Sequence, residues 1–499
     1  MQTVLGLDLG TQSLKALFYD GSTRKVIACE SAALDLFQDE SGAAEQQAQW
    51  WLDALHHVLA NVDPATLASV AAIGVSGQQH GFVALGKNGE VLAPVKLWCD
   101  TSTVAQCNDI MAAYGGMQRC IDDVGNPILA GYTAGKIRRF AKQGGPLYEQ
   151  LDCILLPHDY LNFYLTGERC MEAGDASGTG FLDIRERRWS DRMLHAIDPQ
   201  RDLTECLPQL RVDPGVIGSL RSDVAELTGL PAGIPVSTGG GDNMMGAIGT
   251  GNLSPGRVTM SMGTSGTVYA YSDKPVIDPK GEIAAFCSST GGWLPLMCTM
   301  NCTVTTEQTR NLLGTELSDF ERQVSRSPMG AEGLISLPFY NGERTPNLPR
   351  AKACVMGLDP HNARPENLLR SALEGATFAL RYGLQRMREL DIDDSGVVLT
   401  GGGSASATWR QAVADICNTP VTILHQDEGA AFGAALQALA VLESCSLDEM
   451  QQFADDHLSK NREMCCEPNT TAVNFYDDVY QRYLQSLAAI TPLYAQPVQ

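Results

Sequence analysis

Two segments far apart in the chain share one pattern, in which a Gly-Thr turn joins two apolar strands. The first runs from Thr3 to Tyr19 and the second from Gly256 to Tyr271, so that Leu9-Gly10-Thr11 matches Met262-Gly263-Thr264. Two apolar runs joined by a short polar turn predict a β-hairpin. Because the hairpin recurs after roughly 250 residues, the sequence predicts one fold that is used twice.

Strands alternate with longer helical stretches around these hairpins, which favours an α/β class. We expect a helix over Glu45–Leu59, strands at Val70–Val75 and Phe82–Leu85, and a further helix from Gly429 to Leu442. A stretch rich in Gly and Pro from Pro214 to Pro235 places the domain junction near residue 240. We therefore expect an N-terminal domain over 1–240, a C-terminal domain over 241–445 and a helical tail over 446–499. In the tail, five residues share one helical face and predict a core helix that packs on the body: Tyr476, Tyr480, Tyr483, Leu484 and Leu487.

The balance of charge excludes several classes of partner. The formal net charge is −22, so the chain lacks the basic surface that binding to nucleic acids or anionic membranes requires. The fifteen cysteines contain no Cys-x-x-Cys pair, so we expect reduced thiols rather than disulfides or a zinc site. No run approaches the ~18 apolar residues of a membrane helix, which favours a soluble, cytoplasmic protein.

The first hairpin turn is a candidate phosphate site. Gly10, Thr11 and Gln12 can present backbone N–H groups to phosphate oxygens, and Lys15 just beyond the turn can add positive charge. Asp8 lies on an otherwise apolar strand, where a carboxylate without a partner is costly, so we expect it to meet a cation. An ordinary tight hairpin is the alternative.

Two later turns complete the candidate phosphate and nucleotide sites. Gly263, Thr264 and Ser265 repeat the first turn, with Ser261 where the first copy has Asp8. At Thr400–Ser404 a strand ends in glycines before a helix that starts near Ser406, so a nucleotide can approach the backbone closely. A loop built for close packing is the alternative there.

Asp242 and His80 are the candidate groups for chemistry and for recognition of hydroxyl groups. Asp242 follows a strand and three glycines and opens a small-residue helix, so it is either a helix N-cap or a carboxylate that accepts a proton. His80 lies in Gly77-Gln-Gln-His-Gly81 at the end of a strand, where α/β proteins place ligands. A structural histidine is the alternative.

Taken together, six segments resemble the FGGY family of carbohydrate kinases over nearly the whole chain, and most of all its xylulose kinases. The segments are Gly6–Thr11, Ser76–Gly81, Gly239–Asn243, Ser261–Ser265, Asn341–Pro346 and Gly401–Ser406 with Trp409 and Ala414–Ile416. The resemblance implies two actin-like (ribonuclease H-like) domains around a central catalytic cleft. It also implies ATP and Mg²⁺ as cofactors and phosphorylation of D-xylulose to D-xylulose 5-phosphate.

The resemblance implies a role for each matching residue. Asp242 corresponds to the proton acceptor and Asp8 to the carboxylate beside the metal and phosphates. The sugar contacts are Gln79, His80, Asp100 and Asn243, and the adenosine segment contains Gly401, Gly402 and Ser406. The chain departs from many bacterial members in having Gln79 where they have Met. Its loop Trp98–Thr103 also lacks the usual Arg.

The departures leave the sugar open among xylulose, ribulose, rhamnulose, glycerol and gluconate. A different class of function, an actin- or Hsp70-like ATPase, shares the phosphate hairpins but does not need the Gln-Gln-His turn. A sugar-sensing regulator is the third alternative, and the acidic balance counts against it. Besides sugar and ATP, the sequence implies no nucleic-acid or membrane partner, and it leaves a homodimer open.

Overall fold

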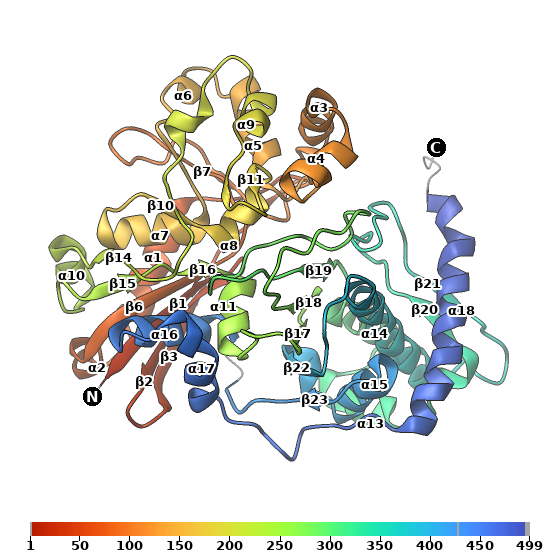
Figure 1. Cartoon of the computed structure of the whole chain (residues 1–499). Coiled ribbons are helices and arrows are strands. Elements are labelled where there is room, and N and C mark those ends of the chain that lie inside the picture. The colour runs from red at the N-terminus through yellow and green to blue at the C-terminus, as the bar shows by residue number, and fades with distance from the viewer. Residues whose placement is uncertain (1, 427–428, 495–499) are drawn as a thin grey trace. The chain divides into compact units, whose positions relative to one another are not determined.

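The computed structural model describes residues 2–426 and 429–494, which divide into two compact units (Figure 1). Unit 1 contains Met1–Leu253, Ser272–Leu294 and Glu428–Leu458, and unit 2 contains Ser254–Tyr271, Pro295–Asp427 and Ser459–Gln499. Both units are discontinuous, unlike the continuous domains expected from the sequence. The sugar, nucleotide and tail domains over 1–240, 241–445 and 446–499 therefore stay a prediction.

Unit 1 is built on a seven-stranded sheet in the order β14-β15-β6-β1-β2-β3, with β16 paired to β6. Its strands are β1 (Thr3–Leu9), β2 (Ser13–Asp20), β3 (Lys25–Ala33), β6 (Val70–Gly77), β14 (Val216–Ser219), β15 (Pro235–Ser237) and β16 (Gly240–Gly241). Smaller sheets contain β4 (Phe37–Gln38), β5 (Ala44–Gln46), β7 (Val83–Leu85), β8 (Val95–Lys96), β9 (Cys153–Leu155), β10 (Cys170–Glu172), β11 (Leu182–Asp183), β12 (Arg188–Trp189) and β13 (Gln209–Arg211).

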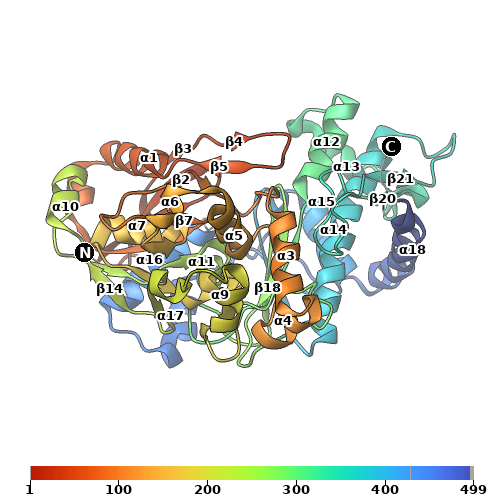
Figure 2. The ribbon, with the colours of Figure 1, turned by 90° about the horizontal axis from the view of Figure 1, so that it is seen from above.

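The described helices of unit 1 are α1 (Ala48–Ala60), α2 (Pro64–Ala68), α3 (Val104–Tyr114), α4 (Met117–Val124), α5 (Thr133–Gln143), α6 (Pro146–Glu149), α7 (Pro157–Thr166), α8 (Ala173–Ala176), α9 (Asp191–Ile197), α10 (Ser222–Thr228), α11 (Asp242–Gly249), α16 (Gly429–Leu442) and α17 (Met450–His457). Those that pack on the seven-stranded sheet include α1, α7 and α16. Helix α1 lies along β2 and β3 (Figure 2). On that face, Leu5 and Leu7 of β1 pack in one core with Trp51 and Leu55 of α1.

The opposite face of β1 is shaped for close contact with α16. A Cβ at Gly6 would lie 2.0 Å from the carbonyl oxygen of Ala431, and one at Gly74 of β6 would lie 2.0 Å from that of Ala434. Side chains alternate between the faces of a strand, so Asp8 lies on the same face as Gly6, one step nearer the end of β1. The glycines therefore let α16 pack tightly while Asp8 marks the point where this face becomes polar.

Unit 2 is built on a five-stranded sheet in the order β19-β18-β17-β22-β23. Its strands are β17 (Arg257–Met262), β18 (Gly266–Ala270), β19 (Leu296–Thr299), β22 (Gly396–Thr400) and β23 (Val421–Thr422), beside a separate pair, β20 (Ile335–Leu337) and β21 (Cys354–Met356). Its helices are α12 (Thr303–Leu313), α13 (Phe320–Val324), α14 (Pro365–Glu389), α15 (Ala407–Cys417) and α18 (Thr470–Tyr494). The long helix α14 packs against β18, β19 and the helices α12, α15 and α18.

The predicted repeat is confirmed by strand order and direction. In unit 1, β2 is antiparallel to β1 and β3, and β6 is parallel to β1 and β15. In unit 2, β18 is antiparallel to β17 and β19, and β22 is parallel to β17 and β23. The expected α/β class is therefore confirmed, and each unit carries the same five-stranded motif of a hairpin extended by parallel strands.

The tail divides between the two units. In unit 1, His457 of α17 lies 2.7 Å from the hydroxyl of Tyr19 on β2. In unit 2, α18 buries Tyr476, Tyr480, Tyr483 and Leu487, which confirms the predicted core helix. Arg370 of α14 donates a 2.7 Å hydrogen bond to Tyr476 and thereby fixes α18 against α14.

Every one of the fifteen cysteines is a free thiol, in agreement with the sequence analysis. Within residues 2–426 and 429–494, no helix combines the length and apolar character of a membrane span.

Candidate active site

Asp8 stands near the carboxyl end of β1, where its side chain is partly exposed. Its Oδ1 accepts a 2.8 Å hydrogen bond from the hydroxyl of Ser76 on β6. Lys15 is its direct partner across the β1–β2 ladder, so a cationic residue lies opposite the carboxylate. In unit 2 the same ladder position pairs Ser261 with Thr267, so neither charge of the first copy is repeated.

Hydrogen bonds that involve Trp98 and Gln78 hold the first hairpin turn in place. The indole of Trp98 donates a 2.9 Å hydrogen bond to the hydroxyl of Thr11, which in turn donates one of 2.9 Å to Gln78. The N–H of Gly10 is used inside the turn, where it donates to the carbonyl of Ser13. The Thr11 hydroxyl proton and the Gly10 N–H are thus committed, which leaves Thr11 and Gln12 to meet a phosphate through their backbone.

Asp242 is the first residue of α11, and the helix N-cap is Gly241. The N-cap role, one of the two considered for Asp242 from the sequence, therefore falls to Gly241. Its Oδ1 accepts hydrogen bonds of 2.8 Å from the backbone N–H and 2.9 Å from the side-chain amide of Asn243. Burial, together with the negative charges of Asp8 and Asp175, raises the pKa of Asp242 to about 7.

Asn243 connects Asp242 to the loop after β6. Its amide nitrogen donates to Oδ1 of Asp242 and also, at 2.8 Å, to Oε1 of Gln79. The amide nitrogen of Gln79 lies 3.2 Å from the sulfur of Met244. A Cβ at Gly241 would lie 2.7 Å from the Gln79 side chain, so the glycine admits Gln79 beside the helix start. The structure therefore brings together three of the predicted residues, Gln79, Asp242 and Asn243.

His80 is buried and strongly held in the same unit. Its backbone adopts a φ of 63°, in the left-handed region that a residue with a Cβ rarely occupies. Its carbonyl accepts hydrogen bonds from Lys136 at 2.6 Å and from Thr133 at 3.2 Å. The imidazole packs edge-on against Tyr132 and Phe286, with ring centroids 5.2 and 5.5 Å away. These contacts hold both the backbone and the ring in one orientation.

Three charged residues around His80 were missed by sequence reasoning: Lys136, His158 and Asp175. Asp175 accepts a 3.2 Å hydrogen bond from the backbone N–H of His80 and lies 3.0 Å from Nδ1 of His158. Lys136 is only 1% exposed, and burial lowers its pKa to about 7. The signal for His158 was available, because the doublet His158-Asp159 follows an apolar run at the end of β9 just as His80 follows β6. Lys136, by contrast, sits on a helix of mixed polarity, where a lysine is usually solvated.

Asp100 is fully buried and engaged by its own surroundings. Its Oδ1 accepts hydrogen bonds from the backbone and hydroxyl of Ser102, and its Oδ2 accepts them from Lys96 and the backbone of Ala44. Its carboxylate holds the loop Trp98–Thr103 against β5 and β8. A sugar hydroxyl could reach this group only by displacing one of these partners, so the geometry does not support the predicted sugar contact.

The predicted nucleotide residues lie in unit 2. A Cβ at Gly401 would lie 2.8 Å from the backbone of Met262, which is the close-packing role considered from the sequence. Gly402, in contrast, has no atom within 4 Å of such a Cβ and leaves the backbone approachable. Ser406 is the N-cap of α15, accepts from the N–H of Trp409 and donates a 2.5 Å hydrogen bond to Glu321. In the second hairpin, Thr264 is exposed, and Gly263 and Ser265 are partly exposed.

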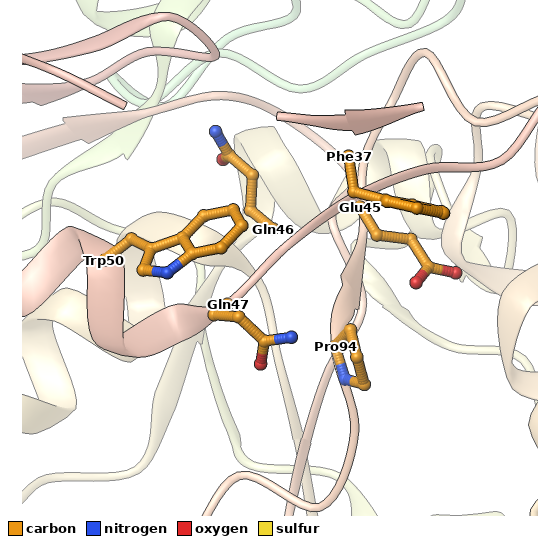
Figure 3. A pocket seen from close by; sticks show the side chains of 6 residues that line it. All are labelled: Phe37, Glu45, Gln46, Gln47, Trp50 and Pro94. Carbon is orange, nitrogen blue, oxygen red and sulfur yellow. The ribbon is translucent and has the colours of Figure 1, made fainter. Parts of the chain in front are cut away.

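A pocket of about 340 Å³ opens elsewhere on unit 1, between β5 and the start of α1 (Figure 3). Its lining residues are Phe37, Glu45, Gln46, Gln47, Trp50 and Pro94. None of the predicted site residues lines it, so the pocket does not coincide with the cluster around Asp242. Over the described ranges, no three His, Cys, Asp or Glu side chains gather in a way that could hold a metal ion by themselves.

Comparison with known proteins gives consistent matches over most of the chain. The N-terminal domain model of the FGGY family of carbohydrate kinases matches residues 3–249, and the C-terminal domain model matches residues 258–442. A xylulose kinase of Haemophilus influenzae is 41% identical over 494 residues, which cover 97% of this chain and 99% of the relative.

Solved structures give the same picture. The structure of a xyloylose kinase from Brucella ovis superposes with a TM-score of 0.90 at 29% identity, over 99% of this chain and 100% of the other. A gluconate kinase from Lactobacillus acidophilus superposes with a TM-score of 0.89 at 23% identity, over 99% of both chains. At that identity the second likeness shows the fold alone, so the fold does not select the sugar.

Proposed function

Because this chain belongs to the FGGY family of carbohydrate kinases, we propose that it transfers the γ-phosphoryl group of ATP to the terminal O5 hydroxyl of D-xylulose. As a carbohydrate kinase it is a phosphotransferase with an alcohol group as acceptor. The relative at 41% identity, a xylulose kinase, supports the choice of sugar. The product is D-xylulose 5-phosphate, and ADP is the leaving group.

The observation that carries the proposal is the hydrogen-bonded series from Asp242 through Asn243 to Gln79. A kinase of this kind needs a proton acceptor beside the groups that recognise the sugar, because the hydroxyl that attacks must lose its proton. Asp242 is the proposed base. A pKa of about 7 suits this role, since the carboxylate is available at neutral pH and still basic enough to accept a proton.

The phosphoryl transfer forms one bond to phosphorus and breaks another. The O5 oxygen of the sugar forms a bond to the γ-phosphorus as the bond from that phosphorus to the β–γ bridging oxygen breaks. The O5 proton passes to Asp242, and the bridging electrons leave with ADP. Asp242 returns the proton to solvent before the next turnover.

Asp8 is the proposed residue on the metal side. Its oxygen donors suit Mg²⁺, which prefers carboxylates, water and substrate phosphates and needs only one or two protein carboxylates. When bound, Mg²⁺ supplies positive charge to the phosphate oxygens. Lys15 lies opposite Asp8 in the ladder and is the proposed second source of positive charge.

The remaining predicted residues divide between sugar and nucleotide. Gln79, His80 and Asn243 are the proposed sugar contacts. The proposed phosphate contacts are the turns Gly10–Gln12 and Gly263–Ser265, and the proposed adenosine contact is Gly402, where the backbone is approachable. That sugar and nucleotide meet in a cleft between the two units stays a prediction, as do the cytoplasmic location and the homodimer.

A substrate panel tests the proposal. ADP release by the purified chain is measured with D-xylulose, D-ribulose, L-rhamnulose, glycerol and D-gluconate, each at a range of concentrations, and without any acceptor. We expect D-xylulose to give the highest kcat/KM and to be consumed one for one with ATP. If the chain prefers gluconate, it is a kinase but D-xylulose is not its substrate. If ADP is released without any acceptor, the chain is an ATPase instead.

A further inference from the structure

The residues around His80 fix the orientation of its imidazole ring and the environment of each ring nitrogen. Its side chain is only 8% exposed, and the edge that carries Nδ1 faces Gly178 and Asp175. A Cβ at Gly178 would lie 1.8 Å from Nδ1, so only a glycine there admits the ring. Because the ring is enclosed and oriented, each of its two nitrogens meets a fixed environment.

Asp175 is the group that faces Nδ1. Its Oδ1 lies 3.4 Å from Nδ1 of His80 and 3.2 Å from the backbone nitrogen of the same residue. One carboxylate oxygen therefore accepts a hydrogen bond from the backbone N–H of His80 and also faces Nδ1 of the same residue at ion-pair distance. Burial alone would raise the pKa of Asp175, but hydrogen bonds from His158 and His80 keep it below the usual value, so the group is a carboxylate.

His158 holds the second oxygen of Asp175 in place. Its Nδ1 lies 3.0 Å from Oδ2 of Asp175, and its Nε2 lies 3.0 Å from Oδ1 of Asp159. Burial alone would lower the pKa of His158, but the two carboxylates outweigh it and raise the pKa well above the usual value. His158 thus carries a proton on both nitrogens, and Asp175 is fixed between two imidazole rings.

We propose that Asp175 is a positioning residue that keeps the proton of a neutral His80 on Nδ1, so that Nε2 accepts a hydrogen bond from a hydroxyl group of the sugar. The inference rests on the proposed function, because it assigns His80 to the sugar. A carboxylate stabilises an N–H that points at it and repels a nitrogen lone pair, so the opposite tautomer would place a lone pair against Oδ1.

Several features around His80 oppose a positive charge on its ring. His158 lies 3.0 Å from Asp175, so Asp175 already has one cationic partner, which Asp159 shares. From α5, the ammonium group of Lys136 donates to the carbonyl of His80 and opposes a second positive charge nearby. The aromatic rings of Tyr132 and Phe286 limit solvation of a charged imidazole.

The role of Nε2 follows from the tautomer. A sugar hydroxyl is both donor and acceptor, and the amide nitrogen of Asn243 is already committed to Asp242 and Gln79. An acceptor at Nε2 fixes the direction of one hydroxyl proton and leaves that oxygen to accept from elsewhere. A sugar that lacks this hydroxyl, or presents it on the other side, leaves a buried acceptor without a donor.

Nuclear magnetic resonance of protein labelled with ¹⁵N-histidine tests the inference without any turnover. The chain contains eight histidines, and the spectrum of His80→Gln identifies the signals of His80. Two-bond ¹⁵N–¹H correlations show which ring nitrogen carries the proton. In the sugar-free protein we expect the His80 ring to carry a proton on Nδ1 and none on Nε2. We expect the His158 ring to carry a proton on both nitrogens. A proton on Nε2 of His80 in the wild-type protein would overturn the inference, whether or not any variant folds.

Two substitutions at Asp175 separate a hydrogen-bonding role from a merely structural one. Asp175→Asn keeps a carbonyl oxygen for the two N–H groups of His80 and turns its amide toward His158, which then gives up a proton. Asp175→Leu has a similar size and no acceptor. We expect Leu to raise KM for the sugar by about 10- to 100-fold and to redistribute the His80 proton, and Asn to keep the wild-type tautomer and most of the affinity. Equal losses in Asn and Leu, with the His80 signals unchanged in both, would contradict the inference.

Asp159→Asn is the matched control, because Asp159 contacts His158 but not His80. It should change the signals of His158 and leave those of His80 in place. Addition of D-xylulose to wild-type protein tests the proposed function separately. If D-xylulose leaves the signals of an Nδ1–H His80 ring unchanged, the contact between His80 and this sugar is wrong, while the tautomer assigned to Asp175 stands.

Discussion

The side-chain amide of Asn243 donates a 2.8 Å hydrogen bond to Oε1 of Gln79, which ties the start of α11 to the loop that follows β6. The same amide donates to Oδ1 of Asp242. The proposed base therefore shares a rigid connection with a proposed sugar contact. A shift of the loop that contains Gln79 would therefore change the position of the Asp242 carboxylate, which is the proposed proton acceptor.

Asp242→Asn should abolish most turnover while the sugar and the nucleotide still bind. Loss of a general base lowers kcat by roughly 10²- to 10⁴-fold. Steady-state kinetics with a binding measurement by calorimetry check this. Because the amide oxygen of Asn can still accept the hydrogen bond from the backbone N–H of Asn243, the variant should unfold close to the wild-type temperature. A variant with normal kcat would show that another group accepts the proton.

The pH dependence of kcat/KM should follow the ionisation of Asp242. Its pKa is raised to about 7, and only the deprotonated form accepts a proton. The rate should therefore rise with pH, pass its half-maximum near 7 and level off above it. Asp8→Asn removes the negative charge that contributes most to raising this pKa, so the half-maximum of its residual activity should move to lower pH. Asp53→Asn, at an exposed position on α1, is the control and should leave the profile unchanged.

Asp8→Asn should lower kcat by about 100-fold or more and increase the Mg²⁺ concentration needed for half-maximal rate. Sugar binding measured without nucleotide should stay close to normal. Ser261→Ala, at the matching ladder position of unit 2, should change kcat by less than about threefold. Similar damage at the two positions would mean that the difference between Asp8 and Ser261 has no functional meaning.

The repeat was predictable because it rests on local pattern. An apolar run, a Gly-Thr turn and a second apolar run specify a hairpin wherever they occur, and Thr3–Tyr19 and Gly256–Tyr271 both form one. Asp8 and Asp242 stood out for a related reason, since a carboxylate at the edge of an apolar or glycine-rich segment is costly without a purpose.

The roles of Lys136 and Asp175 and the place of Ser272–Leu294 could not be predicted, because each depends on contacts between segments far apart in the sequence. The polar pattern of its helix predicts that Lys136 is exposed to solvent. In the structure Lys136 is buried and donates hydrogen bonds to the carbonyl groups of His80 and Gly131. Asp175 acquires its role only because β10 and α8 bring it beside His80. Ser272–Leu294 joins unit 1 although it follows a hairpin of unit 2, and no turn or composition signal marks that crossing.

Ser406→Ala should separate a structural role of this serine from a nucleotide role. The hydroxyl accepts from the N–H of Trp409 and donates to Glu321, so its loss should reduce the free energy of unfolding by about 1 kcal/mol. Ser406→Thr keeps the hydroxyl and should stay near wild type in urea unfolding. Unchanged stability combined with weaker ATP binding would support direct contact with the nucleotide instead.

The identity of the sugar should be visible in how His80→Ala changes specificity. A site that hydrogen-bonds particular hydroxyls loses most for the substrate that satisfies it, because the buried partners are then left unpaired. We expect the change to cost roughly 2–4 kcal/mol in kcat/KM for D-xylulose, or about 30- to 1000-fold, and much less for glycerol, which is too short to engage every contact. Equal losses for all acceptors would show that His80 supports the fold of the loop rather than the choice of sugar.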